Sequence, residues 1–444
     1  MKPVCLHLPV TALPWTVGGK EVFCFGLADE LKALGWDARI AVHQQAPDAP
    51  ALGEHDYRDI PVTVLPPVEA THARRSRYGR RPTAIPGFRD LLARLRPSVV
   101  HLHDLSSEAG ILHLEMARAA GARTVMSYHS PGQSCPQREL LYRRRVVCDG
   151  ELRVGRCTEC RLAAAGLPAG LARLAACFPA GLLNPEGASR LERVLTAREM
   201  TKAHIAGWRE AIALCDAVQV YADWAHRLLV ANGVPESKIA VVRSGQPRAN
   251  CADNRPAGPA RSGDALRIVY VGRCTHEKGI DTLVEAVLSL PPAVPVSVAF
   301  LGPGWDNDHG NALRRRINGD PRFKTPRFTA PEKVVTTMRA FDVCVVPSRW
   351  LETGPIVVYE AFAAGLPVVG SRLGGIADLV TEGVDGLLFE PGDATALSRI
   401  IAGLAGDRSR LDGLAAGIRP PRTFADVARE MDRVYRKLIR GGLE

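Results

Sequence analysis

Apolar runs of strand length alternate with amphipathic runs of helical length along most of the chain. Val4–Leu8 and Asp37–Val42 enclose the helical pattern Glu21–Leu34, and Gly35 follows that pattern as glycine does after a helix. Leu266–Val271 is a continuous β-branched run, typical of a strand buried on both faces. Other such elements are Val99–His103, Thr124–Tyr128, Ile239–Val242, Ile280–Leu290, Val294–Leu301 and a last helix at about Phe424–Leu438. The alternation predicts an α/β protein with parallel sheets.

The length predicts two domains, because 444 residues exceed what one hydrophobic core usually holds. Ser244–Asp264 is rich in proline, glycine, alanine and polar residues without periodicity, which is typical of a linker. We therefore expect a first domain over 1–245 with an insertion at about 130–205, a linker at 246–265, a second domain over 266–422 and a final helix over 423–444. No motif places the Ala/Leu/Arg-rich stretch Gly166–Thr201.

Two carboxylates, Glu352 and Glu360, flank a Gly-Pro turn and the start of an apolar helix. An unpaired buried charge is costly, so these acids are expected to have partners. The amides of a helix start bind phosphate well, and carboxylates accept hydrogen bonds from sugar hydroxyls. Diphosphate plus hydroxyls describes a nucleotide-sugar. The alternative is a helix start with acids placed favourably for its dipole.

Two cations follow the predicted strand Leu266–Val271. Arg273 and Lys278 lie in the loop that leads into the next helix. An arginine fork and a lysine point charge suit a diphosphate leaving group. The alternative is a solvated loop with two cations.

The block with Glu352 and Glu360, together with Arg273 and Lys278, closely resembles the donor-binding block of retaining family-4 glycosyltransferases. The resemblance implies the GT-B fold: two Rossmann-like domains facing across a cleft, with the C-terminal helix crossing back to the first. It implies metal-independent transfer from a UDP-, GDP- or ADP-sugar to an unidentified acceptor, with retention of configuration. Arg273 and Lys278 would neutralise the diphosphate, Glu352 would bind the donor sugar and Glu360 the ribose. The other implied donor-binding residues are Gly18, Gly19, Gly245, Gly272, Gly354, Pro355, Ile356 and Val357.

The chain departs from this family after the first glutamate. Thr353-Gly354-Pro355 stands where many relatives have Gly-Phe-Gly. Proline has no N–H, so one amide is lost to the phosphate.

The first domain offers a glycine turn and a histidine. Gly18 and Gly19 open the first predicted helix, where paired glycines would let the backbone approach the donor phosphate and the acceptor; a turn chosen only for its conformation is the alternative. His129 follows the strand Thr124–Tyr128, and the resemblance assigns it to the transferred sugar. Otherwise it is an ordinary loop histidine.

Four cysteines form the second distinctive pattern. Cys135, Cys148, Cys157 and Cys160 have the spacing Cys-x12-Cys-x8-Cys-x2-Cys, which favours a tetrahedral structural Zn²⁺ site. Reduced thiols, an iron-sulfur cluster and disulfides are the alternatives. Some family-4 enzymes carry a similar Cys-rich insertion, which we expect to be structural or acceptor-facing.

Positive charge is concentrated in one third of the chain. The formal net charge is +10, and Thr71–Arg173 with 18 Arg and 8 acids accounts for 18 − 8 = +10. Arg74–Arg81 and Arg143–Arg145 are its clusters. They predict an anionic partner: a membrane face, a lipid diphosphate or an acidic glycan. The alternative is a bias towards arginine, since the chain has 48 Arg and 9 Lys.

The start of the chain lacks an apolar signal-peptide core, and no run reaches the about 18–20 apolar residues of a membrane span. We therefore expect a cytoplasmic protein, peripheral to the inner membrane face if it contacts a bilayer. Other functions to weigh are a GT-B nucleotide-sugar epimerase and a non-catalytic zinc-stabilised binding protein. A nucleic-acid module is disfavoured because the basic region has few aromatics for base stacking.

Overall fold

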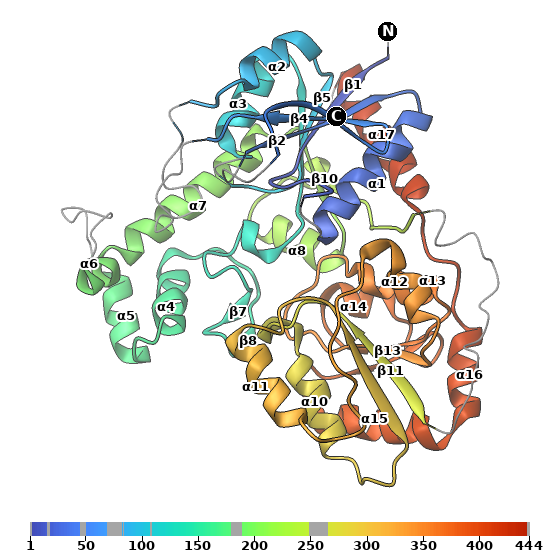
Figure 1. Cartoon of the computed structure of the whole chain (residues 1–444). Coiled ribbons are helices and arrows are strands. Elements are labelled where there is room, and N and C mark those ends of the chain that lie inside the picture. Colours follow the sequence, from blue (N-terminus) through green and yellow to red (C-terminus); the bar gives the residue numbers. More distant parts are fainter. Residues whose placement is uncertain are drawn as a thin grey trace. The chain divides into compact units, whose positions relative to one another are not determined.

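The computed structural model describes residues 2–15, 18–44, 50–68, 82, 84–106, 109–178, 189–247 and 265–441. Figure 1 shows the chain, which divides into one unit of Met1–Arg243 with Ala425–Glu444 and another of Ser244–Phe424. The basic cluster Arg74–Arg81 and most of the predicted linker, 248–264, lie outside the described residues.

The first unit is built on an eight-stranded sheet in the order β10-β9-β6-β5-β1-β2-β4-β3. Its strands pair in parallel except β3 with β4, an antiparallel hairpin that the sequence pattern did not predict. The strands are β1 (Val4–Leu8), β2 (Asp37–His43), β3 (Gly53–Tyr57), β4 (Ile60–Leu65), β5 (Val99–Leu102), β6 (Arg123–Ser127), β9 (Ala217–Val220) and β10 (Ile239–Val241). The predicted strands on both sides of the first helix are thus confirmed.

Helices connect these strands as in a Rossmann-like unit. They are α1 (Gly19–Ala33), α2 (Phe88–Leu95), α3 (Ile111–Ala119), α7 (Ala197–Leu214) and α8 (Asp223–Ala231), with 3₁₀ turns η1 (Pro131–Gln133) and η2 (Glu236–Lys238). Gly35, just after α1, has a φ of 89°, the left-handed conformation predicted for it.

The C-terminal helix α17 (Phe424–Arg440) packs on the first unit, as the resemblance implied. Tyr435 is fully buried, and its hydroxyl lies 2.6 Å from Nδ1 of His101. Trp36 donates from Nε1 to Asp432 over 2.7 Å, and Arg436 donates to the Leu34 carbonyl over 3.1 Å. Apolar burial, one buried hydrogen bond and two partly buried ones therefore join chain segments 334 to 402 residues apart.

The cysteine-rich insertion folds as a short hairpin followed by helices. These are β7 (Leu141–Tyr142), β8 (Val146–Val147), α4 (Val154–Ala164), α5 (Ala169–Cys177) and α6 (Arg190–Leu195), which lead into α7. The helices enclose a small apolar cluster of their own around Leu162, Ala172 and Ala197. Gly166–Thr201, which no motif placed, thus contributes α5, α6 and the start of α7, except for 179–188, which are not described.

The second unit has a five-stranded parallel sheet in the order β12-β11-β13-β14-β15. Alternate residues of β11 enter different cores: Ile268 and Tyr270 pack in one and Val269 in the other. Burial on both faces explains why Ile268, Val269 and Tyr270 follow one another without a charged residue, whereas Arg267 forms an ion pair with Asp342. The strands are β11 (Leu266–Val271), β12 (Val296–Leu301), β13 (Val343–Val346), β14 (Val368–Ser371) and β15 (Gly386–Phe389). The helices are η3 (His276–Lys278), α10 (Ile280–Leu288), α11 (Asp308–Ile317), α12 (Pro331–Met338), α13 (Ile356–Ala363), α14 (Gly374–Leu379), α15 (Ala394–Gly406) and α16 (Arg408–Ala416).

Gly245 lies where the chain enters this unit, beside the segment by which it leaves. The Gln246 amide donates to the Arg422 carbonyl over 2.8 Å, and the Phe424 amide donates to Gln246 over 2.8 Å. A Cβ on Gly245 would lie 2.6 Å from the Thr423 carbonyl oxygen. The structure therefore gives Gly245 a packing role, and its assignment to the donor stays a proposal.

Across the part of the chain that the structure describes, no helix is both long and apolar enough to span a bilayer.

Candidate active site

The turn between β11 and α10 fixes Lys278 against the segment after β13. Lys278 ends η3, and Gly279 follows it with a φ of 65°. A Cβ on Gly279 would lie 1.9 Å from the Pro347 carbonyl oxygen, so only glycine allows this approach.

Lys278 forms an ion pair with Glu352. Its Nζ lies 2.8 Å from Oε1 of Glu352, and the Ser348 hydroxyl donates to the same oxygen over 2.7 Å. Burial raises the pKa of Glu352, but the charge and hydrogen bonds of Lys278, with help from Ser348 and Trp350, outweigh it and hold that pKa below its usual range. The structure therefore joins two residues that the sequence treated as separate motifs.

Helix α13 begins where the sequence predicts, after Pro355, which is its N-cap. Ile356 and Val357 supply the first amides of the helix, and the Val358 amide already donates to the Pro355 carbonyl over 3.0 Å. Helix N-termini attract anions, so these amides suit a phosphate. Gly354 forms the bend just before them.

Glu360 is the fifth residue of α13 and is half-buried. Burial raises its pKa to about 7. No described residue donates a hydrogen bond to its carboxylate, in contrast to Glu352. It is therefore a candidate partner for hydroxyl donors of a ligand.

Two glycines that were not predicted as site residues, Gly374 and Gly375, pack against the backbone of Glu352. The Gly375 amide donates to the Glu352 carbonyl over 2.7 Å, and a Cβ on Gly375 would lie 2.8 Å from that oxygen. Gly374 has a φ of 52° and meets the same backbone. The pair of glycines in Leu373-Gly374-Gly375 was the available signal, since two adjacent glycines often mark close backbone approach.

Arg273 is placed differently from Lys278. Its side chain is exposed and makes no hydrogen bond or ion pair with any described residue. Gly272, just before it, has a φ of 153°, and a Cβ on Gly302 would lie 2.2 Å from the Gly272 carbonyl oxygen. The strand ends are thus tightly packed, while the Arg273 guanidinium is free to meet an anion.

In the first unit, His129 follows β6 and lies among polar groups. Its Nε2 is 3.2 Å from Nδ1 of His103 and 3.1 Å from the Tyr221 hydroxyl. Burial lowers the pKa of His129 to about 3, with a further lowering by Lys20 and an opposing effect of Asp104. His129 is therefore a neutral imidazole at physiological pH.

Gly18 and Gly19 open α1 as the sequence predicts. A Cβ on Gly18 would lie 2.6 Å from Oε2 of Glu21, whose carboxylate is buried and accepts a hydrogen bond from Thr11. Lys20, one residue on from Gly19, forms an ion pair with Asp104 after β5. Neither the Thr11–Glu21 contact nor the Lys20–Asp104 ion pair is predicted by the sequence, because each joins residues of separate segments.

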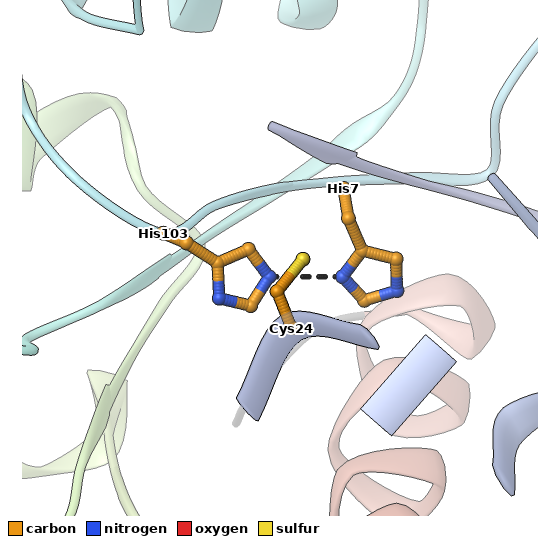
Figure 2. Close-up of side chains that lie close together, drawn as sticks. All are labelled: His7, Cys24 and His103. Carbon is orange, nitrogen blue, oxygen red and sulfur yellow. Dashed lines mark hydrogen bonds between the residues drawn. The ribbon is translucent and has the colours of Figure 1, made fainter. Parts of the chain in front are cut away.

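A buried histidine cluster lies behind His129 and was also missed. Figure 2 shows His7, Cys24 and His103, with Nδ1 of His7 2.9 Å from Nε2 of His103. Their ligand atoms lie within 4.8 Å of one another, which makes them the single such group among the described residues. Two imidazoles and a thiol are ligands for soft metals. Here, however, the two facing nitrogens already bond to each other, so His103 links His7 to His129.

The four cysteines of the predicted zinc site gather around the hairpin. Cys135 follows η1, Cys148 follows β8, and Cys157 and Cys160 lie in α4. Burial raises the pKa values of Cys148, Cys157 and Cys160, as do neighbouring thiols, whereas a backbone N–H lowers each. One of these N–H groups belongs to Arg143 and lies 3.1 Å from Sγ of Cys160. No three of the four sulfurs lie within 4.8 Å of one another.

Two known protein families match this chain, one in each unit. A family described as "Glycosyltransferase Family 4" matches residues 17–153, and one described as "Glycosyl transferases group 1" matches residues 265–407. The chain belongs to glycosyltransferase family 4. The two matches contain most of the residues described above, including His129, Lys278 and both glutamates.

Curated relatives match this family-4 chain over part of their length. D-inositol 3-phosphate glycosyltransferase 1 of Catenulispora acidiphila is 32% identical over 259 residues, which is 54% of this chain and 62% of the relative. Sulfoquinovosyl transferase SQD2 of Arabidopsis thaliana is 34% identical over 154 residues, which is 34% of this chain and 27% of the relative. The chain thus spans less than two thirds of the length of each.

Solved structures show that the family-4 chain has the GT-B fold. Anabaena Alr3699/HepE in complex with UDP and glucose matches with a TM-score of 0.62 at 16% identity, over 98% of this chain and 99% of that one. Sucrose-phosphate synthase from Thermosynechococcus elongatus matches with a TM-score of 0.63 at 19% identity, over the full length of both. The predicted fold class is therefore confirmed.

Proposed function

We propose that this protein is a retaining glycosyltransferase that moves a sugar from a nucleotide-sugar to an acceptor without a catalytic metal. The observation that carries the proposal is the Lys278–Glu352 ion pair beside the N-terminus of α13. A cation, helix amides and carboxylates, grouped at the carboxyl ends of parallel strands, suit a diphosphate with hydroxyl-bearing sugars on either side.

The chemistry divides among the residues by charge. Arg273 and Lys278 neutralise the diphosphate as it departs, which is where negative charge develops. The amides of Ile356 and Val357 add dipoles to the same group, at a turn made by Gly354 and Pro355, although Pro355 has no N–H to give.

The carboxylates and the histidine then orient the donor. Glu352 accepts hydrogen bonds from the sugar and Glu360 from the ribose, while His129, a neutral imidazole, contacts the transferred sugar. The bond from the anomeric carbon to the phosphate oxygen breaks, and a bond to the acceptor oxygen forms on the same face. The departing phosphate takes the acceptor proton.

The donor is proposed to be a UDP-sugar first, with GDP- and ADP-sugars as the other candidates. Solved relatives favour this order: HepE is described with UDP-glucose, and a starch synthase IV with ADP and acarbose. The acceptor remains a glycan, a lipid-linked sugar or a small molecule. The basic surplus favours an acidic acceptor or an anionic membrane surface, and so a cytoplasmic enzyme peripheral to the inner membrane face.

We also propose a structural zinc at Cys135, Cys148, Cys157 and Cys160. The four thiols are of the right chemical type, and the N–H of Arg143 directed at Cys160 resembles the outer hydrogen bonds that support metal thiolates. Tetrahedral zinc needs its sulfurs about 3.8 Å apart, so binding would draw these closer together. The site lies in the insertion, apart from the donor residues in the chain, and is given no catalytic role.

Thermal-shift titration with UDP, GDP and ADP, without added divalent metal, tests the donor site. We expect one nucleotide to stabilise the protein, and Lys278→Ala to weaken that effect. Lys324→Ala is the matched control, because Lys324 is an exposed cation elsewhere in the same unit. No shift with any nucleotide would count against the proposal.

Incubation with the preferred nucleotide-sugar then separates the alternatives. Transfer to an acceptor, or slow donor hydrolysis, supports the transferase. Conversion to an isomeric nucleotide-sugar would identify an epimerase, and binding with neither reaction would favour a non-catalytic binding protein.

A further inference from the structure

The helical insertion of the first unit contains a hollow of its own, with a volume of about 320 Å³. That is far more than the about 30 Å³ that one water occupies. Its lining comes from α4, from Ala165 and Leu167 just after it, from α6 and from the start of α7. The lining residues are Arg161, Leu162, Ala165, Leu167, Arg190, Arg193, Val194 and Ala197. Three of the eight are arginines and the other five are apolar.

The three arginines lack acidic partners among the described residues. Nη1 of Arg161 donates to the Thr201 hydroxyl over 3.3 Å, and Nε of Arg193 donates to the Ser189 carbonyl over 3.4 Å. None of the three forms an ion pair with a described carboxylate, although Arg161 also faces the thiols of Cys135 and Cys157. Three arginines that line one hollow without a carboxylate partner favour the binding of an anionic ligand there.

Glu192, the acidic residue nearest in sequence to Arg190 and Arg193, already accepts hydrogen bonds within its own helix start. Glu192 lies between Arg190 and Arg193 in α6, but its carboxylate accepts hydrogen bonds from the amide and hydroxyl of Ser189, at the start of the same helix. It closes a capping box and so is not available to neutralise the arginines.

Large apolar side chains stand exposed in the same insertion. Leu171 and Leu174 of α5 are 54% and 71% exposed, and Leu191 of α6 is 67% exposed. Phe178, just after α5, continues the spacing of one helical face. Exposed leucines next to arginines are typical of helices that lie in a bilayer interface.

We propose that this hollow binds the phosphate of an anionic membrane lipid, with the exposed leucines of α5 and α6 entering the bilayer interface. The phosphate meets Arg161, Arg190 and Arg193, and the apolar lining accommodates the adjoining glycerol and acyl carbons. The inference rests on the membrane association that is part of the proposed function. It assigns that association to the hollow and to helices α5 and α6.

Vesicle co-sedimentation of the full chain tests the site, with phosphatidylcholine vesicles with and without phosphatidylglycerol. We expect binding only to the vesicles with phosphatidylglycerol. A basic residue near an anionic surface contributes about fivefold to binding, so R190Q/R193Q should lose more than about twentyfold. The matched control is R315Q/R316Q, which removes two exposed arginines of α11 in the second unit. We expect it to lose less than about threefold.

Two further arms separate the lipid from a soluble anion. Leu174→Ser with Leu191→Ser should weaken vesicle binding, although both side chains are exposed and neither lines the hollow. Binding of inorganic diphosphate with no preference for phosphatidylglycerol vesicles would overturn the lipid assignment. An equal loss of vesicle binding in the two double-arginine variants would show that only the overall positive charge matters. That result would overturn the proposed phosphate site in the hollow.

The nucleotide-induced thermal shift is measured on every variant. The unfolding transition in the same measurement shows that each variant is folded, and the nucleotide-induced shift keeps the two proposals apart. A normal shift without lipid selectivity overturns only the membrane site, whereas lipid binding without any nucleotide response overturns only the donor site.

Discussion

Nζ of Lys278 lies 2.8 Å from Oε1 of Glu352, although 74 residues separate them. The contact exists because β11 and β13 are neighbours in the parallel sheet, so the loops at their carboxyl ends meet. The lysine thus keeps the buried carboxylate ionised. If a nucleotide-sugar binds as proposed, we expect Lys278 to be shared between Glu352 and the diphosphate.

Breaking this pair should cost stability as well as donor affinity. Lys278→Ala leaves Glu352 buried without its cation, and removing one partner of a buried pair costs about 3–5 kcal/mol. The double variant K278M/E352Q should be less destabilised than K278A, because no charge is left unpaired. Urea unfolding of the single and double variants measures this, and equal losses in both would contradict the coupling.

Glu360 should make the protein less stable as the pH rises. Its folded pKa of about 7 lies above the ordinary value of 4.5, so the folded chain holds this proton more tightly than the unfolded chain. The advantage is complete below about pH 4.5 and is lost by about pH 7 and above. Glu360→Gln should therefore be more stable than wild type at pH 8, by up to about 3 kcal/mol, with little gain at pH 5. Glu332→Gln, at an exposed position of α12, should show no such difference.

The buried histidines should have the opposite effect. Burial lowers the pKa values of His7 and His129 to about 3 and holds those of His101 and His103 well below 6.5. Their contribution is full above pH 6.5 and is lost on acidification, by about 1.4 kcal/mol per pH unit for each proton. Between pH 6.5 and 5, the unfolding free energy of His7→Phe should fall less steeply with decreasing pH than that of wild type. The difference should correspond to about one fewer proton taken up on unfolding. His276→Gln, at an exposed position, should leave the slope unchanged.

The cysteine cluster should hold about one zinc per chain. Cys157→Ser should lose the metal and lower the unfolding temperature, since metal-binding energy orders a small subdomain. Cys177→Ser is the control, because Cys177 is exposed on α5 outside the cluster. Elemental analysis of the purified protein with and without chelator measures the metal, and wild type without zinc would rule the site out.

Tyr435→Phe should loosen the C-terminal helix from the first unit. The hydroxyl of Tyr435 is buried and contacts Nδ1 of His101, whose Nε2 is occupied by Ser127 over 2.8 Å. Removing it leaves an imidazole nitrogen unsatisfied, at a cost of about 1–3 kcal/mol. Tyr57→Phe removes a hydroxyl of a partly exposed tyrosine and should have little effect. Hydrogen exchange of α17 localises the change, and equal protection in both variants would contradict it.

The sequence by itself determined the elements whose signals are local. Val4–Leu8 and Leu266–Val271 were predicted with the bounds that the structure has, because an apolar run between polar flanks reports burial of that run alone. The glutamates around α13 and the cations after β11 were identified from two short segments, by their charge, their place beside a predicted helix or strand, and the family resemblance. The β3 strand Gly53–Tyr57 was missed because it lies at the edge of the sheet and is mostly polar. Tyr57 is its only large, partly apolar side chain.

Only the tertiary structure decided which of these residues meet. His7, His101, His103 and His129 look unrelated along the chain, yet β1, β5 and β6 are adjacent in the sheet, and His7 is paired in register with His101. The links from Tyr435 to His101 and from Lys278 to Glu352 likewise depend on strand order and on the return of α17. A sequence pattern reports how each segment is buried, but contact between distant segments depends on sheet order and register, which arise only when all the strands pack together.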